Sequence, residues 1–266
     1  MSSERRVALT IAGSDSSGGA GIQADLKTFA ALGVYGTSAI TALTAQNTLG
    51  VTATFSLPAD FVTAQIEAVG GDLSLHATKL GMMSTSAIVE AVAAAIKELE
   101  LPNVVVDPVL VAKSGDRLLD KDAVQTLCQE LLPQALVVTP NIPEAELLSG
   151  TTVASADDVR EAARRIHAMG ASAVVVKGGH APGDDVVDVL FDGERFIEFH
   201  TVRIATKNTH GTGCTFASAI AAYLALGCSL AEATERAQRY VAGAIRNALG
   251  IGRGHGPLDH FWRGNV

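Results

Sequence analysis

The feature that most constrains the fold of this chain is a repeated alternation of short, β-branched apolar runs with longer segments of helical periodicity. Runs such as residues 104–106 are apolar at every position, as in parallel strands covered on both faces. The segments between the runs repeat apolar residues at helical spacing, for example Phe61 and Ile66, which we expect to face inward. The expected strands are 7–12, 37–43, 78–81, 103–107, 136–139 and 173–177, and the expected helices follow Gly21 and cover 58–69, 84–99, 157–169, 213–226 and 230–248.

The pattern changes between residues 185 and 202, where two apolar runs flank Asp192-Gly193, a dipeptide typical of a hairpin turn. This hairpin predicts an antiparallel edge on an α/β fold whose central sheet is mainly parallel, with helices on both faces. No linker, repeat or low-complexity tract interrupts the alternation, so a single domain over residues 1–266 is expected. Such sheets bind ligands beyond the carboxyl ends of their strands, where we look for chemistry.

Composition narrows the class of partner. Charged residues make up 18% of the chain and the formal net charge is −8, which leaves no basic footprint for nucleic acid or an anionic membrane. Cys128, Cys214 and Cys228 are an odd number without metal-ligand spacing, which favours a reducing compartment over a disulfide framework or a zinc site. No signal peptide is recognisable, and no apolar run reaches the roughly 18 residues of a membrane span. We expect a cytoplasmic protein with a small-molecule partner.

Residues 13–21 form a glycine-rich loop that resembles two nucleotide-binding motifs without matching either. The segment 19–24 has the G-x-G-x-x-A spacing of dinucleotide folds, but it lies too far past the first strand, and Gln46 stands where an acid is needed. Gly13 and Gly18 have the spacing of a P-loop, but Gly19 replaces its lysine. A dinucleotide remains an alternative, as does a turn whose glycines serve only backbone geometry.

The segment Asn208-Thr209-His210-Gly211-Thr212-Gly213-Cys214 opens a long helix of small residues. The unpaired N–H groups and positive end of that helix predict a cradle for charge on a phosphoryl group, with a purely structural helix start as the alternative. Cys214 lies in the first turn, where the helix dipole is expected to lower the pKa of the thiol so that it accepts a proton. The alternative for this cysteine is a small buried apolar side chain.

Polar side chains follow three of the expected strands: Asp107 ends one, Asn141 and Glu144 follow another, and Lys177 ends a third. The carboxylate and amide oxygens suit Mg²⁺ beside a nucleotide, although Glu144 also fits the role of a helix N-terminal acid. The ammonium of Lys177 is expected to neutralise phosphate oxygens. The histidines show no ligand spacing, and only His210 is retained as a candidate phosphate contact.

Taken together, these motifs are similar to those of the hydroxymethylpyrimidine/phosphomethylpyrimidine kinases of thiamine biosynthesis. The resemblance is specific in residues 12–28 and extends over nearly the whole chain, through segments 40–48, 79–82, 107–109, 112–115, 139–141, 177–180 and 208–214. It implies a three-layer α/β/α ribokinase-like fold, the cofactors ATP and Mg²⁺, and a homodimer. Cysteine at position 214, where the superfamily commonly has aspartate, is typical of the pyrimidine kinase branch and of some related pyridoxal kinases.

The resemblance also implies roles for single residues. The reacting hydroxymethyl would be held by Asp25, and the ring would be bound by Gly13, Ala20, Gln46, Met82 and Val109. The Gln46 amide would match the donor and acceptor edge of an aminopyrimidine. The catalytic set would be Cys214, Lys177, Gly211, Thr212 and Gly213. The nucleotide would be bound by Thr139, Asn141, Lys177, Thr206, Gly211 and Gly213, and Mg²⁺ by Asp107, Asn141 and Glu144. Residues 113–117 would form a lid.

The implied reaction is ATP-dependent phosphorylation of 4-amino-5-hydroxymethyl-2-methylpyrimidine, followed by phosphorylation of the monophosphate to the diphosphate. A pyridoxal or pyridoxine kinase of the same fold is the alternative, because both substrates are flat heteroaromatic rings that bear a hydroxymethyl group. A binding or regulatory domain that keeps the fold without turnover is expected to have lost the anion cradle or the base, and both motifs are present here.

Overall fold

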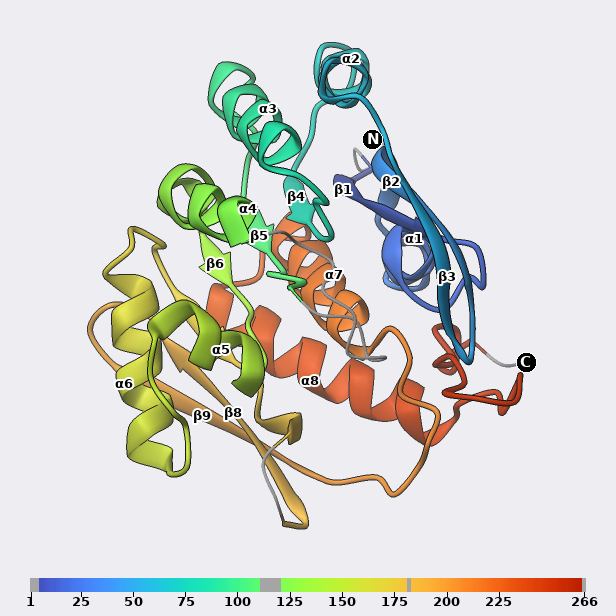
Figure 1. The fold of residues 1–266 in the computed structure, drawn as a ribbon. Helices are drawn as coiled ribbons and strands as arrows, with labels where there is room; N and C mark the ends of the chain where they lie inside the picture. Colours follow the sequence, from blue (N-terminus) through green and yellow to red (C-terminus); the bar gives the residue numbers. More distant parts are fainter. Residues whose placement is uncertain (1–4, 111–120, 181–182, 265–266) are drawn as a thin grey trace.

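The strands of this protein form one mixed sheet in a computed structural model, which describes residues 5–110, 121–180 and 183–264 (Figure 1). The strands are β1 (Val7–Asp15), β2 (Tyr35–Asn47), β3 (Gly50–Ser56), β4 (Ala77–Leu80), β5 (Val104–Val106), β6 (Val137–Val138), β7 (Val174–Val176), β8 (Asp185–Phe191) and β9 (Phe196–Val202). Their order across the sheet is β3-β2-β1-β4-β5-β6-β7-β8-β9. The strands from β2 to β7 pair in parallel, whereas β3, β8 and β9 pair antiparallel.

Helices cover both faces of the sheet, which confirms the three-layer α/β/α architecture (Figure 1). One layer contains α1 (Gly21–Ala31), α7 (Thr212–Ala225) and α8 (Leu230–Arg246). The other contains α2 (Ala59–Gly70), α3 (Ser86–Glu98), α4 (Lys121–Thr126), α5 (Ile142–Ser149) and α6 (Ala156–His167). Short helical turns lie at η1 (Leu127–Leu131), η2 (Leu132–Gln134) and η3 (Gly178–His180).

The buried strands divide their side chains between the two layers, as period-two alternation requires. In β5, Val104 and Val106 pack against the α2–α6 layer, while Val105 packs against α7 and α8. Such strands are apolar on both faces because both faces are covered, which is why their sequences read as continuous apolar runs.

The antiparallel hairpin at the β8–β9 edge confirms the expectation drawn from Asp192-Gly193. The opposite edge strand β3 was not expected; its largest apolar side chain, Phe55, is 65% exposed, so the segment lacks the signature of a buried strand. The expectation that Phe61 faces inward is wrong: it is 56% exposed, and Val62 fills the core instead. Helix α4 was also not expected, whereas α5 confirms the alternative in which Glu144 is a helix N-terminal acid. The proposed lid at 113–117 lies outside the described residues.

Candidate active site

A cavity of about 750 Å³ opens at the carboxyl ends of the parallel strands. The start of α7, the end of β7 and the loop after β1 all contribute to its lining, as expected for an open α/β sheet. Most of the residues singled out from the sequence meet there: Gly13, Ala20, Gln46, Met82, Asp107, Val109, Asn141, Glu144, Lys177, Gly211, Thr212, Gly213 and Cys214.

Asp25 is not among the residues that line this cavity, and its expected contact with the substrate hydroxymethyl stays a prediction. It lies on the inward face of α1, is fully buried, and pairs with the equally buried Lys79 at 2.9 Å. Its other oxygen accepts a hydrogen bond from Ser218 at 2.6 Å, and Thr10 donates at 2.7 Å. Asp25 therefore ties α1 to β1, β4 and α7 behind the cavity wall.

Thr139 and Thr206 also lie outside the lining, and the nucleotide-binding role expected for them stays a prediction. Thr139 is fully buried, and its hydroxyl lies 3.4 Å from the Asp107 carboxylate. The hydroxyl of Thr206 accepts a hydrogen bond from the backbone N–H of Asn208 at 3.1 Å. Both threonines support residues or loops of the site from outside it.

The N-terminus of α7 faces the cavity with its backbone donors. Among the described residues, no side chain caps this helix, whose N-cap is Gly211. Gly211 has φ +82°, and a Cβ there would stand 1.8 Å from the carbonyl oxygen of Gly19. A Cβ on Gly213 would lie 3.4 Å from Lys177 Nζ. The turn thus brings helix N–H groups beside an ammonium, an arrangement suited to a phosphoryl group.

The thiol of Cys214 lies between two helix starts. The backbone N–H of Gly21, the first residue of α1, donates to its Sγ, and Lys79 contributes a nearby positive charge. Burial outweighs both influences and raises the pKa of the thiol to about 11. The lowered pKa expected from the helix dipole alone is therefore wrong, because the same packing that brings the thiol to the helix start removes it from water.

The charged side chains at the ends of β5, β6 and β7 form one cluster. Lys177 Nζ lies 2.8 Å from Asp107 Oδ1. Burial works against the charge of Lys177, but Asp107 and Glu144 outweigh it and hold the pKa of the ammonium above its ordinary value. Burial raises the pKa of Glu144 to about 7, with a contribution from the negative charge of Asp107 and an opposing one from Lys177.

Asn141 and Glu144 also begin helix α5 as a reciprocal capping box. The Asn141 side chain accepts from the Glu144 N–H at 2.9 Å, and Glu144 accepts from the Asn141 N–H at 2.8 Å. The side-chain oxygen of Asn141 thus caps the helix, and its expected role as a metal ligand stays a prediction. The described part of the chain holds no group of three or more His, Cys, Asp or Glu side chains arranged for a metal ion.

Two residues that the sequence did not single out hold the turn after Lys177. The carboxylate of Asp188 accepts from the backbone N–H of Gly178 at 2.8 Å and from the Gln238 amide at 2.9 Å. A Cβ on Gly178 would stand 2.0 Å from the carbonyl oxygen of Val187, so only glycine fits. In the sequence, the Gly178-Gly179 pair was the signal that could have indicated this turn. Asp188 on β8 and Gln238 on α8 could not be linked to it, because they are distant in sequence.

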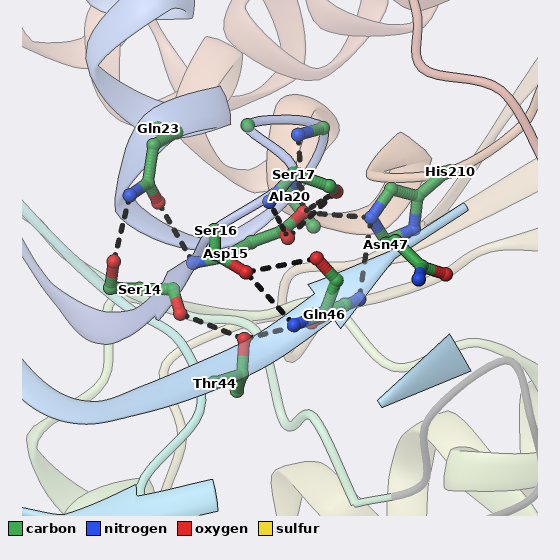
Figure 2. A network of polar contacts seen from close by, with 12 residues as sticks. Ser14, Asp15, Ser16, Ser17, Ala20, Gln23, Thr44, Gln46, Asn47 and His210 are labelled. Carbon is green, nitrogen blue, oxygen red and sulfur yellow. Dashed lines mark hydrogen bonds and ion pairs between the residues drawn. The ribbon is translucent and has the colours of Figure 1, made fainter. Parts of the chain in front are cut away.

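Gly13, Met82 and Gln46 also line the cavity, where Met82 supplies apolar surface and Gln46 an amide. A Cβ on Gly13 would lie 3.2 Å from Met82 Sδ, so the glycine keeps this wall open. Asp15 fixes the adjoining loop by accepting the backbone N–H groups of Gly19 and Ala20 at 3.1 and 2.8 Å (Figure 2). Sequence reasoning gave Asp15 no role.

The fold and the site together define a ribokinase-like α/β/α enzyme of the small-molecule kinase class. More particularly, the model of the phosphomethylpyrimidine kinase family matches residues 15–259, and the chain belongs to that family. Among the described residues, no helix combines the length and apolar character needed to cross a membrane.

Curated relatives and a solved structure agree with this placement. The chain is 54% identical to a bifunctional thiamine biosynthesis protein of Geobacter sulfurreducens over 95% of its own length, and spans 52% of that longer protein. It is 51% identical to a hydroxymethylpyrimidine/phosphomethylpyrimidine kinase of Bacillus subtilis, covering 96% of this chain and 94% of the relative. An ADP complex of Bacillus subtilis pyridoxal kinase superposes with a TM-score of 0.89 at 41% identity, covering 97% of this chain and 98% of the other.

Proposed function

We propose that this protein is an ATP-dependent kinase that phosphorylates the hydroxymethyl group of 4-amino-5-hydroxymethyl-2-methylpyrimidine and then converts the monophosphate to the diphosphate. The observation that carries the proposal is one cavity lined by the α7 N-terminus, Lys177, Cys214 and the Gln46 amide. The name of the Bacillus subtilis relative, a kinase of both pyrimidines, supports the same assignment.

The ring end of the cavity suits a flat aminopyrimidine. The side chains of Met82 and Val109 supply apolar surface, and the amide of Gln46 supplies one donor and one acceptor in a plane. An aminopyrimidine presents the complementary pair, a ring nitrogen beside an exocyclic amine. A ring without that pair would leave the amide unsatisfied, at a cost of roughly 1–3 kcal/mol.

The phosphoryl end acts through position and charge. The backbone N–H groups at the start of α7 and the ammonium of Lys177 converge on the space beside Gly213. Because phosphoryl transfer passes through a loose transition state with charge on its outer oxygens, donors fixed in advance supply most of the catalysis. The raised pKa of Lys177 keeps its side chain charged for this task.

Asp107 and Glu144 are the residues that would hold Mg²⁺ together with water and the phosphates of ATP. They are buried carboxylates that line the same cavity, and the negative charge of Asp107 contributes to the raised pKa of Glu144. Mg²⁺ sites commonly use one or two carboxylates plus substrate phosphates. When bound, the ion would neutralise charge on the nucleotide. Asn141 would contribute by fixing Glu144 at the start of α5.

The two transfers place different demands on this chain. In the first, an alcohol loses its proton, and the Cys214 sulfur is the group we assign to receive it. In the second, the nucleophile is a phosphate oxygen already largely ionised near neutral pH, so a base contributes little. The second step instead brings more negative charge beside Lys177 and the α7 N-terminus, which raises the demand for neutralisation.

A pyridoxal or pyridoxine kinase is the second candidate, because the 41% identical Bacillus subtilis structure is named a pyridoxal kinase. Incubation with ATP, Mg²⁺ and either ring alcohol, followed over time by mass spectrometry, separates the two. We expect pyrimidine monophosphate to rise and then give way to diphosphate, with a Lys177→Ala protein as the inactive control. Accumulation of monophosphate alone, or consumption of pyridoxine alone, contradicts the proposal.

We also propose a homodimer in a reducing, cytoplasmic compartment. Leu43 and Phe55 face each other across the β2–β3 pair and are 46% and 65% exposed. Paired apolar side chains at a sheet edge are typical of a surface covered by another molecule. All three cysteines are free thiols, which fits the compartment.

A further inference from the structure

His210 lines the cavity and lies beside both Asp15 and the Gln46 amide (Figure 2). The Asp15 carboxylate is 3% exposed, and its Oδ2 lies 2.8 Å from His210 Nε2. Its other partners are the hydroxyl of Ser17 and backbone N–H groups of the loop at residues 17–20. His210 directly precedes Gly211, the N-cap of α7. One imidazole therefore contacts the loop of the ring pocket and begins the phosphoryl-binding turn.

The contact with Asp15 fixes which nitrogen of His210 carries a proton. Hydrogen bonds from His210 and Ser17 hold the pKa of Asp15 at about 2 against the effect of burial, so the carboxylate is ionised at neutral pH. An ionised carboxylate only accepts hydrogen bonds. His210 Nε2 must therefore donate to Asp15, and cannot at the same time accept a hydrogen bond from another group.

The side-chain amide of Gln46 lies between His210 and Thr44 (Figure 2). Its nitrogen is 3.4 Å from His210 Nε2, and its oxygen is 3.1 Å from the Thr44 hydroxyl. That hydroxyl has a single proton and also lies 2.9 Å from the carbonyl oxygen of Ser14, which can only accept. In this orientation the Gln46 amide nitrogen faces the N–H of His210, so two donors face each other. The Gln46 oxygen competes with the Ser14 carbonyl for the single proton of the Thr44 hydroxyl.

Turning the amide by 180° removes the contact between two donors, since its two ends have the same shape and are assigned from their hydrogen-bond partners. The single Nε2–H of His210 then faces two acceptors, Asp15 at 2.8 Å and the Gln46 amide at 3.4 Å. The Gln46 oxygen then lies beside the N–H of His210, and its NH₂ donates to the Thr44 hydroxyl, whose own proton goes to Ser14. Each end of the amide keeps one further hydrogen-bonding position for a ligand in the cavity. The network thus defines a single polarity for the amide.

We propose that His210 is a positioning residue that sets the polarity of the Gln46 amide and thereby decides which way round a ring is held. This inference rests on the proposed function, in which Gln46 binds the ring. With the amide oxygen on the side of His210, a ring must place an exocyclic donor there and an acceptor nitrogen on the side of Thr44.

This polarity has a consequence for the alcohol. In the 4-amino-5-hydroxymethylpyrimidine the hydroxymethyl carbon is attached next to the amine-bearing carbon, on the side away from the ring nitrogen that Gln46 would also bind. Holding the amine beside His210 therefore directs the alcohol toward the residues that follow His210, where α7 begins. A ring held the other way round would direct its alcohol away from α7.

The test compares two ring alcohols that differ only in polarity: the 4-amino compound and its 4-oxo counterpart, which presents an N–H and a carbonyl in reversed order. The readout is the ratio of kcat/KM for the two compounds. We expect His210→Leu to lower this ratio about tenfold, the effect of one hydrogen bond. His210→Gln, whose amide nitrogen can donate to both Asp15 and Gln46, should retain the ratio.

A second pair of variants tests the same network from the other end and leaves the Asp15 loop intact. Thr44→Val removes the acceptor for the Gln46 NH₂ and should also lower the ratio, whereas Thr44→Ser should keep it. A ratio unchanged in both His210→Leu and Thr44→Val, in proteins with wild-type melting temperatures, would overturn the inference. If the wild type phosphorylates neither pyrimidine, the proposed function itself fails, which is a different result.

Discussion

The thiol of Cys214 is mostly protonated at neutral pH, since burial raises its pKa to about 11. A group with so high a pKa is a strong base once it is ionised, but few molecules carry the thiolate at any moment. Cys214→Ala should therefore lower kcat for the first phosphorylation by about 10²-fold, the lower end of general-base effects, and leave the second nearly unchanged. Separate assays with alcohol and monophosphate as substrates measure this, and equal losses in both steps would falsify the assignment.

Asp15 gives a pH dependence with a defined sign. Its folded-state pKa of about 2 lies below the ordinary 3.8, so the ionised form stabilises the fold above pH 4, and this contribution disappears as the pH falls toward 2. A shift of this size corresponds to about 2 kcal/mol. In urea unfolding, the free energy of unfolding of Asp15→Asn should lie below that of the wild type by at least this amount at pH 7. The difference should shrink toward pH 3. A difference independent of pH would contradict this prediction.

At the scale of elements, the two glycines that begin α7 should respond in opposite ways. A methyl group on Gly211, whose φ is +82°, would collide with the Gly19 carbonyl. Gly211→Ala should therefore lower the free energy of unfolding by roughly 1–3 kcal/mol. It should also bind the pyrimidine less well. A methyl group on Gly213 meets Lys177 Nζ at an acceptable 3.4 Å.

Gly213→Ala should therefore keep the melting temperature of the wild type while its methyl group occupies the phosphoryl position. We expect kcat to fall by about 10²-fold, the usual effect of a small misplacement at a reacting centre. Thermal unfolding and steady-state kinetics on the two variants provide the comparison. Similar behaviour of both would mean that the turn serves the helix and not the phosphoryl group.

Elements with a strong periodic signal were predictable, and those defined by distant partners were not. The runs around Val105 and Val175 lie in buried strands, and their continuous apolar sequences indicate this burial. Strand β3 owes its place to pairing with β2, and α5 begins at a capping box whose members had been assigned as metal ligands. Conversely, the burial of Asp25 on the inward face of α1 could not be predicted from its charge.

The same division applies to the site. The glycine turns and strand-end residues that line the cavity could be listed from sequence because their chemistry is local. The partners that orient them could not, because Asp188 reaches Gln238 across 50 residues and Asp15 reaches His210 across 195. Their burial, and with it the pKa of Cys214, is set only when the layers pack.

At the scale of the whole molecule, the exposed pair of Leu43 and Phe55 predicts how copies of the chain associate. Light scattering coupled to size exclusion should show a dimer for the wild type. Phe55→Glu should give a monomer, because burying an unpaired carboxylate costs more free energy than the association of an ordinary interface provides. As a control, Leu249→Glu changes an exposed apolar side chain outside the sheet and should leave the dimer intact.

The contact between the Gly19 carbonyl and Gly211 joins segments from opposite ends of the chain. During synthesis, β1 and its loop leave the ribosome long before α7 exists, although β1 lies inside the finished sheet between β2 and β4. The ligand cavity therefore assembles late, after a long loop has been closed. A nascent chain that stalls before α7 should already contain all nine strands of the sheet and have no capacity to bind nucleotide, so ligand binding can report the completion of folding.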